Sequence, residues 1–381
     1  MNRVYLDWNA TAPLRQEARG AMLAAMDVVG NPSSVHAEGR AAKAIVEKAR
    51  GQVAALVGCA PGDVVFTSGA TEAAHAVFNL PFNKIWDSAL EHDAVLGALL
   101  QANGMERSSL EVSATTIGAP NLDGLADPFE WAKHASPKLH VVSAANAETG
   151  VLSDWRKVRR ISSDLESAWF CDATQAIGKT CFSVSEVGAD YAICSAHKIG
   201  GPKGAGALIA RAQIDPFHVF IKGGGQEMGR RSGTENVTGI AGFGAAAEAA
   251  QHDLEHCAWD RVRRLRDDLE QALAAAAPDL HVFGQEAPRL PNTSCFAVRG
   301  WKGETQVMQM DLAGFAVSAG SACSSGKVNK ASRVLKAMGH DEEMASSAIR
   351  VSIGPTTTEA EVMAFADTWI EHYRRRRARA A

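Results

Sequence analysis

Four features of the chain could do chemistry: a lysine, a hydroxyl-rich turn, an aspartate and a cysteine. Lys198 lies just past an apolar run at 191–194 and precedes a stretch of small residues at 200–206. Desolvation lowers the pKa of a lysine amine and makes it a nucleophile toward aldehydes. Taken alone, the pattern is more typical of a surface lysine such as Lys203. The interpretation of Lys198 therefore depends on the other three features.

The hydroxyl-rich turn lies at residues 66–74 (FTSGATEAA), where an apolar run ends and a helical pattern begins near Ala70 and Thr71. The free N–H groups and the positive dipole at the start of a helix can bind a phosphate group. The alternative is an ordinary helix capped by Ser68 or Thr71.

The aspartate is Asp172, which directly follows the apolar run 168–171. A carboxylate at the end of a buried strand needs a partner. That partner could be a protonated ring nitrogen, or else an arginine or a hydrogen bond in the core. Together with a phosphate-binding turn and a reactive lysine, such an aspartate indicates a site for pyridoxal 5′-phosphate.

The cysteine is Cys323, in the segment 318–327 (SAGSACSSGK). Its serine and glycine neighbours favour an exposed, mobile loop, in which a thiol is a candidate second nucleophile. An accidental surface thiol is the alternative.

Short apolar runs alternate with helical patterns in the first two thirds of the chain. The runs 64–67, 139–143, 168–171 and 191–194 predict strands, and 40–56 and 154–167 predict helices. This order is typical of the α/β class, with a mostly parallel sheet that binds ligands at the carboxyl ends of its strands. We expect a large domain at 1–250, including the N-terminal segment. A smaller α+β domain at 251–381 would carry Cys323.

The composition excludes several classes of protein. The 381 residues have a formal net charge of -4, which gives nucleic acid no overall basic field. The seven cysteines include no C-x-x-C pair, so neither a metal site nor a disulfide framework is expected. No apolar run reaches the roughly 18 residues of a membrane span. With no long apolar signal segment at the N-terminus, the sequence predicts a cytoplasmic protein.

Ordered blocks over almost the whole chain resemble the cysteine desulfurases, which are class V members of the fold-type-I pyridoxal phosphate enzymes. The blocks include YLDWNATAP (5–13), FTSGATEA (66–73), SAHKIGGPKGAGAL (195–208), GGGQEMGRRSGTEN (223–236) and SAGSACSSG (318–326).

The resemblance implies a homodimer with shared sites that takes sulfur from L-cysteine. Lys198 would bind the cofactor covalently, Arg350 would take the substrate carboxylate by a bidentate pair, and Cys323 would receive the sulfur as a persulfide, leaving alanine. The implied cofactor contacts are Ala70, Thr71, Ser195 and His197 at the phosphate, Thr234 at the phosphate of the other subunit, Asp172 at the ring nitrogen, Gln175 at the ring oxygen, and His92 stacked on the ring, where it could help to transfer protons.

One departure from the family pattern lies near this site. Ala147 stands where the family has an asparagine that contacts cofactor or substrate. The expected sulfur acceptor is a protein of iron–sulfur cluster, thio-cofactor or tRNA thiolation chemistry. Two alternatives stay open: a selenocysteine lyase or other pyridoxal phosphate lyase, which would not need Cys323, and a non-catalytic scaffold, which would not need Lys198.

Overall fold

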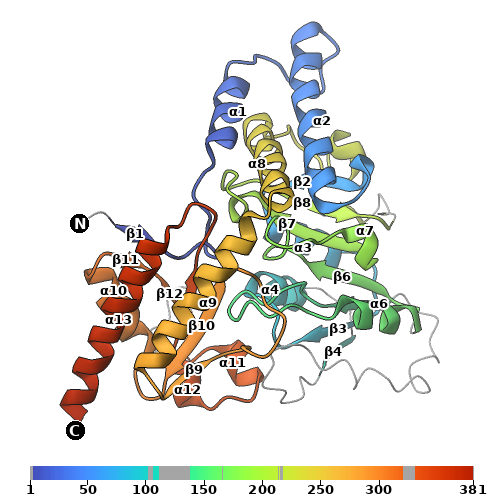
Figure 1. The fold of residues 1–381 in the computed structure, drawn as a ribbon. Coiled ribbons are helices and arrows are strands. Elements are labelled where there is room, and N and C mark those ends of the chain that lie inside the picture. The colour runs from blue at the N-terminus through green and yellow to red at the C-terminus, as the bar shows by residue number, and fades with distance from the viewer. Residues whose placement is uncertain are drawn as a thin grey trace.

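The computed structural model describes residues 3–101, 106–110, 138–164, 166–212, 214, 218–320 and 331–380. Its centre is a seven-stranded sheet in the order β2-β8-β7-β6-β5-β3-β4 (Figure 1). Strand β8 is antiparallel to both of its neighbours, and the other paired strands run parallel. The strands are β2 (Val64–Thr67), β3 (Lys84–Ser88), β4 (Glu106–Leu110), β5 (Lys138–Val141), β6 (Ala168–Asp172), β7 (Tyr191–Ser195) and β8 (Gly206–Ala210).

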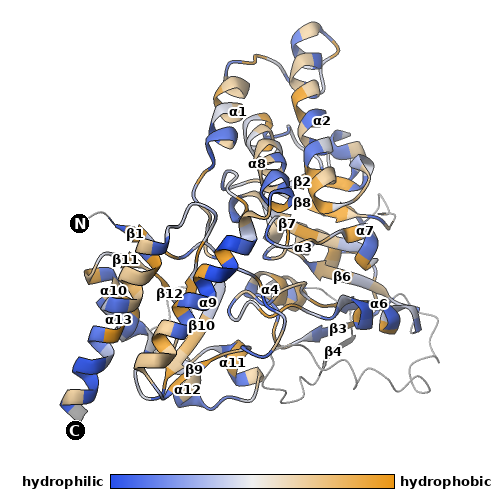
Figure 2. Cartoon of the chain, in the orientation of Figure 1, coloured by the Kyte–Doolittle hydropathy of each residue, from blue (hydrophilic) through white to orange (hydrophobic). Residues whose placement is uncertain are grey.

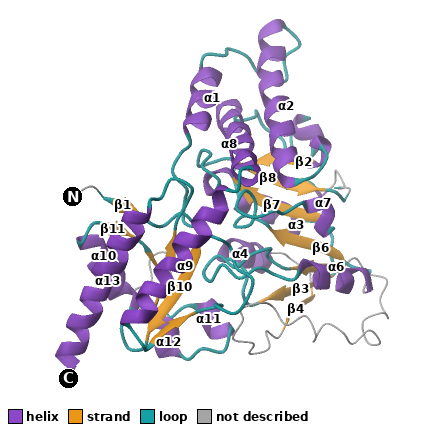
Figure 3. Cartoon of the chain, viewed as in Figure 1, coloured by secondary structure: helices purple, strands orange, loops and turns teal. Residues whose placement is uncertain are grey.

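Helices cover both faces of this sheet because successive strand residues point to opposite sides. In β2, Val65 packs in the cluster that includes α3 and α4, whereas Phe66 packs in the cluster that includes α2, α6, α7 and α8. Figure 3 shows these helices around the strands. They are α1 (Gln16–Met26), α2 (Ala37–Val57), α3 (Ala70–Phe78), α4 (Asp93–Gln101), α6 (Trp155–Asp164), α7 (Val184–Val187) and α8 (Val237–Glu255).

A second, antiparallel sheet has the order β12-β13-β10-β9. Its apolar residues pack in two further clusters, one with α9, α10 and α13 and one with α11 and α12. In Figure 2, α9 and α13 carry many hydrophilic residues, whereas β6, β7 and β8 are largely hydrophobic. The elements are α9 (Ala258–Ala276), β9 (Leu280–Val282), β10 (Thr293–Val298), α10 (Gly303–Leu312), β12 (Ser318–Ala319), α11 (Arg333–Ala337), α12 (Glu342–Ser346), β13 (Ala348–Ser352) and α13 (Glu359–Ala380).

The N-terminal segment packs against the part of the molecule that contains the second sheet. Strand β1 (Val4–Tyr5) pairs in parallel with β11 (Phe315–Ala316), and Leu6 is buried in the cluster with α9 and α13. The chain then crosses to the central sheet, where Ala12 N donates to His197 O at 2.8 Å. The N-terminal segment therefore connects the two sheets. The domain limits at 250 and 251 stay a prediction.

The expected α/β class with a mostly parallel sheet is confirmed. The predicted strands at 64–67, 168–171 and 191–194 correspond to β2, β6 and β7, while β5 ends two residues before the expected limit at 143. None of the described helices is long and apolar enough to cross a lipid bilayer.

A buried ion pair holds the segment that leads to Thr234 against the central sheet. Arg50 Nη1 lies 2.7 Å and Nη2 2.9 Å from the two carboxylate oxygens of Glu227, and both side chains are buried. Glu227 Oε2, which accepts from Arg50 Nη1, also accepts from Phe66 N at 2.9 Å. Glu227 has φ 50 in the left-handed region, a costly conformation for a non-glycine residue. The ion pair therefore holds a strained turn in place.

We expect Arg50→Met to lower the free energy of unfolding by about 3–5 kcal/mol, because the Glu227 carboxylate would stay buried without its partner. Urea denaturation followed by circular dichroism measures this loss. Arg299→Met is the matched control, since Arg299 pairs with Asp341 and Glu343 on the surface and its loss should matter much less. Equal effects of the two substitutions would contradict the prediction.

Candidate active site

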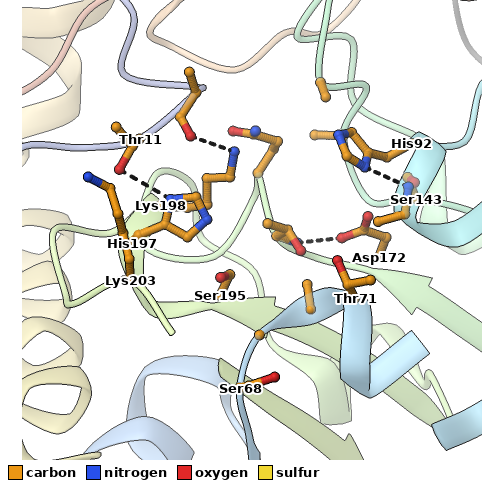
Figure 4. A pocket seen from close by; sticks show the side chains of 18 of the residues that line it. Thr11, Ser68, Thr71, His92, Ser143, Asp172, Ser195, His197, Lys198 and Lys203 are labelled. Atoms are coloured by element: carbon orange, nitrogen blue, oxygen red, sulfur yellow. Dashed lines mark hydrogen bonds between the residues drawn. The ribbon is translucent and has the colours of Figure 1, made fainter. Parts of the chain in front are cut away.

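A cavity of about 560 Å³ opens at the carboxyl ends of the central strands, where parallel sheets bind ligands. Figure 4 shows side chains from several elements around it. Eight of the residues predicted from the sequence line this cavity: Ala70, Thr71, His92, Asp172, Gln175, Ser195, His197 and Lys198.

Lys198 reaches the cavity from a single turn of 3₁₀ helix, Ala196–Lys198, that follows β7. Its amine donates to Asn9 O at 2.6 Å and to Ala10 O at 3.0 Å, and the residue is half-buried. The alternative of a surface lysine is therefore wrong. Gly206 is needed beside it, because a side chain there would come within 2.5 Å of the Gly69 backbone. The small residues after Lys198 thus allow β8 to pass close to the first turn of α3.

Helix α3 presents its N-terminus to the cavity. Its N-cap is Gly69, and no side chain caps it, so the alternative of a Ser68 or Thr71 cap is wrong. Glu72 instead reaches back to accept from Ser68 N at 2.9 Å. The N–H groups at the start of α3 are suited to an anion, and the Ser195 hydroxyl lies next to Gly69 at the same end of the cavity.

Asp172 is the last residue of β6 and is buried. One of its carboxylate oxygens accepts from Thr174 N at 2.9 Å (Figure 4). Thr174 also lines the cavity, and its hydroxyl is buried without a hydrogen-bond partner among the described residues. A buried polar atom of this kind indicates that the cavity accommodates a ligand.

Two histidines at the cavity have lowered pKa values. Burial is the main reason that the pKa of His92 falls below its usual value; Asp172 raises it and Lys198 lowers it further. Burial, reinforced by neighbouring lysines, lowers the pKa of His197 to about 4. His92 Nδ1 accepts from Ala94 N at 3.0 Å, which fixes the orientation of the ring. Both imidazoles are therefore neutral near pH 7.

The comparisons with known proteins agree with this arrangement. Residues 4–365 match the model of the family described as Aminotransferase class-V. The chain belongs to the class-V aminotransferase family. A cysteine desulfurase of Cereibacter sphaeroides is 40% identical over 95% of this chain and 93% of its own. The cysteine desulfurase IscS of Dictyoglomus turgidum is 34% identical over 94% and 91%.

Solved structures give the same result. A NifS-like protein from Rickettsia africae superposes with a TM-score of 0.87 at 32% identity, covering 98% of this chain and 99% of its own. A structure described as SspA in complex with cysteine has a TM-score of 0.76 at 25% identity, covering 93% and 100%. The family and the fold expected from the sequence are confirmed.

Arg350, the substrate residue implied by the class-V resemblance, lies next to the cavity on β13. In this structure its guanidinium donates to Asp7 Oδ1 at 2.8 Å and to Ala147 O at 2.9 Å. Ala147 itself lines the cavity. Asn146 does not, because its side chain forms a turn by accepting from Glu148 N and Thr149 N. The Asn146 amide therefore does not replace the asparagine that the resemblance implies at position 147.

For two residues implied by the class-V resemblance, the expected role stays a prediction. Thr234 is exposed and does not line the cavity, and its contribution to a second subunit stays a prediction. Cys323 lies outside the described residues, so its role also stays a prediction.

The sequence analysis missed several polar residues around the cavity. Thr11, Ser143 and Thr174 line the cavity. Asn9 and Lys179 are bonded to each other behind the lining residues, where Asn9 also contacts Lys198 and Lys179 contacts Gln175. The spacing of Gln175 and Lys179, four residues apart directly after a predicted strand, was a signal that could have drawn attention to the second lysine.

Proposed function

We propose that the protein is a cysteine desulfurase that uses pyridoxal 5′-phosphate to take sulfur from L-cysteine. The observation that carries the proposal is the convergence of Lys198, Asp172 and the start of α3 on one cavity. Relatives more than 30% identical over nearly their whole length are described as cysteine desulfurases. The solved complex of SspA with cysteine supports the substrate class.

The residues present suit this cofactor. A phosphate would be held by the first turn of α3 with Ser195 and His197, and a protonated ring nitrogen would face the Asp172 carboxylate. The buried Thr174 hydroxyl without a partner is consistent with a polar ligand. When bound through Lys198, pyridoxal phosphate would supply an electron sink for charge that develops at the substrate Cα.

Protonation of the ring, proton transfer at the substrate Cα and binding of the substrate carboxylate would each depend on a different side chain of this protein. Asp172 would keep the ring nitrogen protonated by charge pairing. The Lys198 amine, once free of the cofactor, would move the proton from the substrate Cα, and the neutral His92 imidazole is placed to help. Arg350 would hold the substrate carboxylate in place of its present bonds to Asp7 and Ala147 O.

Sulfur transfer would fall to Cys323. Its thiolate would attack the sulfur of the substrate, forming an S–S bond while the C–S bond breaks with its electron pair going to carbon. That carbon would take a proton, so that alanine leaves and Cys323 keeps a persulfide. A sulfur-acceptor protein, of iron–sulfur cluster or thiolation chemistry, would receive the sulfur next.

The proposal includes a homodimer. Thr234 is exposed and outside the cavity of its own chain, as a residue that completes a second subunit's phosphate site must be.

The decisive experiment incubates the cofactor-loaded protein with L-cysteine and a thiol reductant and measures sulfide and alanine. We expect Cys323→Ala to bind L-cysteine, seen as a change in cofactor absorbance, but to release sulfide at least about a hundredfold more slowly. Cys181→Ala removes an exposed thiol elsewhere in the chain and should behave as the unmodified protein does. Undiminished sulfide release by Cys323→Ala would contradict the persulfide step.

A further inference from the structure

A second lysine is fully buried directly behind the cavity. Lys179 is 2% exposed, and its amine lies 2.6 Å from Gln175 Oε1 and 3.0 Å from Asn9 Oδ1. Burial lowers the pKa of this amine well below its usual value, and the charges of Lys198 and Arg350 lower it further. Charged or neutral, the amine can donate to both oxygens. A buried lysine is costly, so its two bonds require an explanation.

The first bond is to Asn9, whose polar atoms are all used. Its side-chain oxygen accepts from Lys179 and from Asn292, and its side-chain nitrogen donates to Thr293 Oγ1 at 2.8 Å. Its backbone N–H donates to Ser352 Oγ at 2.9 Å. Its backbone carbonyl accepts from Lys198 at 2.6 Å. Lys179 therefore helps to fix the group that holds the Lys198 amine.

The second bond decides which way the Gln175 amide faces. Lys179 donates, so the acceptor Oε1 must point toward it, and Nε2 must point the other way. One Nε2 hydrogen is donated to Asn9 O at 3.0 Å. The other hydrogen remains for the cavity that Gln175 lines. A flipped amide would place its N–H groups against the donor of Lys179 and its oxygen against the Asn9 carbonyl.

We propose that Lys179 is a positioning residue, which holds the Gln175 amide with its nitrogen toward the cofactor and the Asn9 carbonyl toward Lys198. The inference rests on the proposed function, because the ligand that would accept from Gln175 is the phenolic ring oxygen of pyridoxal phosphate. Lys179 would contact neither cofactor nor substrate. It would act through the side-chain amides of Asn9 and Gln175, which its amine contacts on the side away from the cavity.

The test compares pyridoxal phosphate binding by Lys179→Met, Gln175→Met and the double variant, using equilibrium dialysis of the cofactor-free dimer. We expect Lys179→Met to weaken binding about tenfold, the equivalent of one good hydrogen bond. In the Gln175→Met background, the same change should have a clearly smaller effect, since one of the two amides that it orients is gone and only the contact with Asn9 remains. Additive effects would overturn the proposal, and so would an unchanged affinity of Lys179→Met.

Two controls separate other causes. Lys302→Met removes an exposed lysine at the start of α10 and should leave cofactor affinity unchanged. Thermal unfolding of the cofactor-free variants measures any purely structural loss. If Lys179→Met lowers the stability but leaves the affinity for pyridoxal phosphate and the pH midpoint of the cofactor absorbance unchanged, the role of Lys179 is structural. That result would contradict the proposal.

Gln175→Glu provides a second route if Lys179→Met does not fold. A carboxylate at 175 would pair with the Lys179 amine, which offsets the contact of its second oxygen with the Asn9 carbonyl, so the cofactor-free protein should remain folded. The carboxylate would offer the cofactor no donor. We expect cofactor binding about tenfold weaker; unchanged binding would overturn the proposal. Wild-type protein that binds no cofactor at all would instead contradict the proposed function, so the two failures are distinguishable.

Discussion

Lys198→Ala should abolish the covalent attachment of pyridoxal phosphate and lower turnover of L-cysteine by at least about 10³-fold. The physical reason is that one amine would both bind the cofactor and move the substrate Cα proton, and a positioned acid–base group alone contributes about 10²–10⁴-fold. Borohydride reduction followed by peptide mass spectrometry checks the first part. The cofactor mass should stay on the peptide that contains residue 198 in the wild type and be missing from the variant.

Lys203→Ala is the matched control, because Lys203 lines the same cavity from an exposed position five residues further on. It should keep the reducible link. A link that survives in Lys198→Ala, or that disappears in Lys203→Ala, would reject the assignment of Lys198. The cofactor-free Lys198→Ala protein provides a further readout: the pKa of His92 should rise, since the charge of Lys198 lowers it at present.

The residues that the sequence located best are those that directly follow an apolar run. Asp172 ends β6 and Lys198 lies just beyond β7, while Thr71 stands in the first turn of α3 after β2. Burial fixes where such strands end, and parallel strands end at one edge of a sheet, so neighbouring ends meet. The positions of the short apolar runs were therefore enough to predict that these side chains lie close together. Their roles came from the resemblance and stay predictions.

The hydrogen bonds that hold the site residues in position could not be predicted in this way, because each of them joins segments that are far apart in the chain. The bond from Lys179 to Asn9 spans 170 residues and that from Asn292 to Asn9 spans 283. Local patterns carry no information on such pairs. The same holds for β1, whose two residues pair with β11 near the other end of the chain. Helix α6 ends at Asp164, before the expected limit at 167, and Glu166 has φ 48, which is outside the right-handed helical region.

The same dependence on distant contacts explains why Arg350 was only partly understood. The resemblance implied that Arg350 takes the substrate carboxylate, but its bonds to Asp7 and to Ala147 O became known only from the fold. Asp7 belongs to the segment that also carries Asn9. The N-terminal segment thus contacts Arg350 through Asp7 and Lys198 through the Asn9 carbonyl. These two contacts lie on the two sides of its crossing between the sheets.

Asp172→Asn should lower turnover of L-cysteine by about 10²–10³-fold while the cofactor stays linked to Lys198. An asparagine fills the same volume but has no charge with which to keep the ring nitrogen protonated, so the stabilisation of charge developing at the substrate Cα is lost. The attachment itself depends on the lysine and should survive. Steady-state kinetics together with the borohydride experiment separate the two effects, since Lys198→Ala loses both and Asp172→Asn only one.

The substitution should also move a titration that does not involve the cofactor. Asp172 raises the pKa of His92, so removing its charge should lower that pKa further, in the direction opposite to Lys198→Ala. Nuclear magnetic resonance of the His92 ring in the cofactor-free protein measures the shift. Asp190→Asn is the matched control, because Asp190 lies at the amino end of β7, where its carboxylate accepts from Trp169 N at 2.9 Å. It should leave both turnover and the His92 pKa unchanged. If Asp172→Asn turned over at the wild-type rate, the charge at 172 would not support the reaction, and the ring nitrogen would have to be assigned another partner.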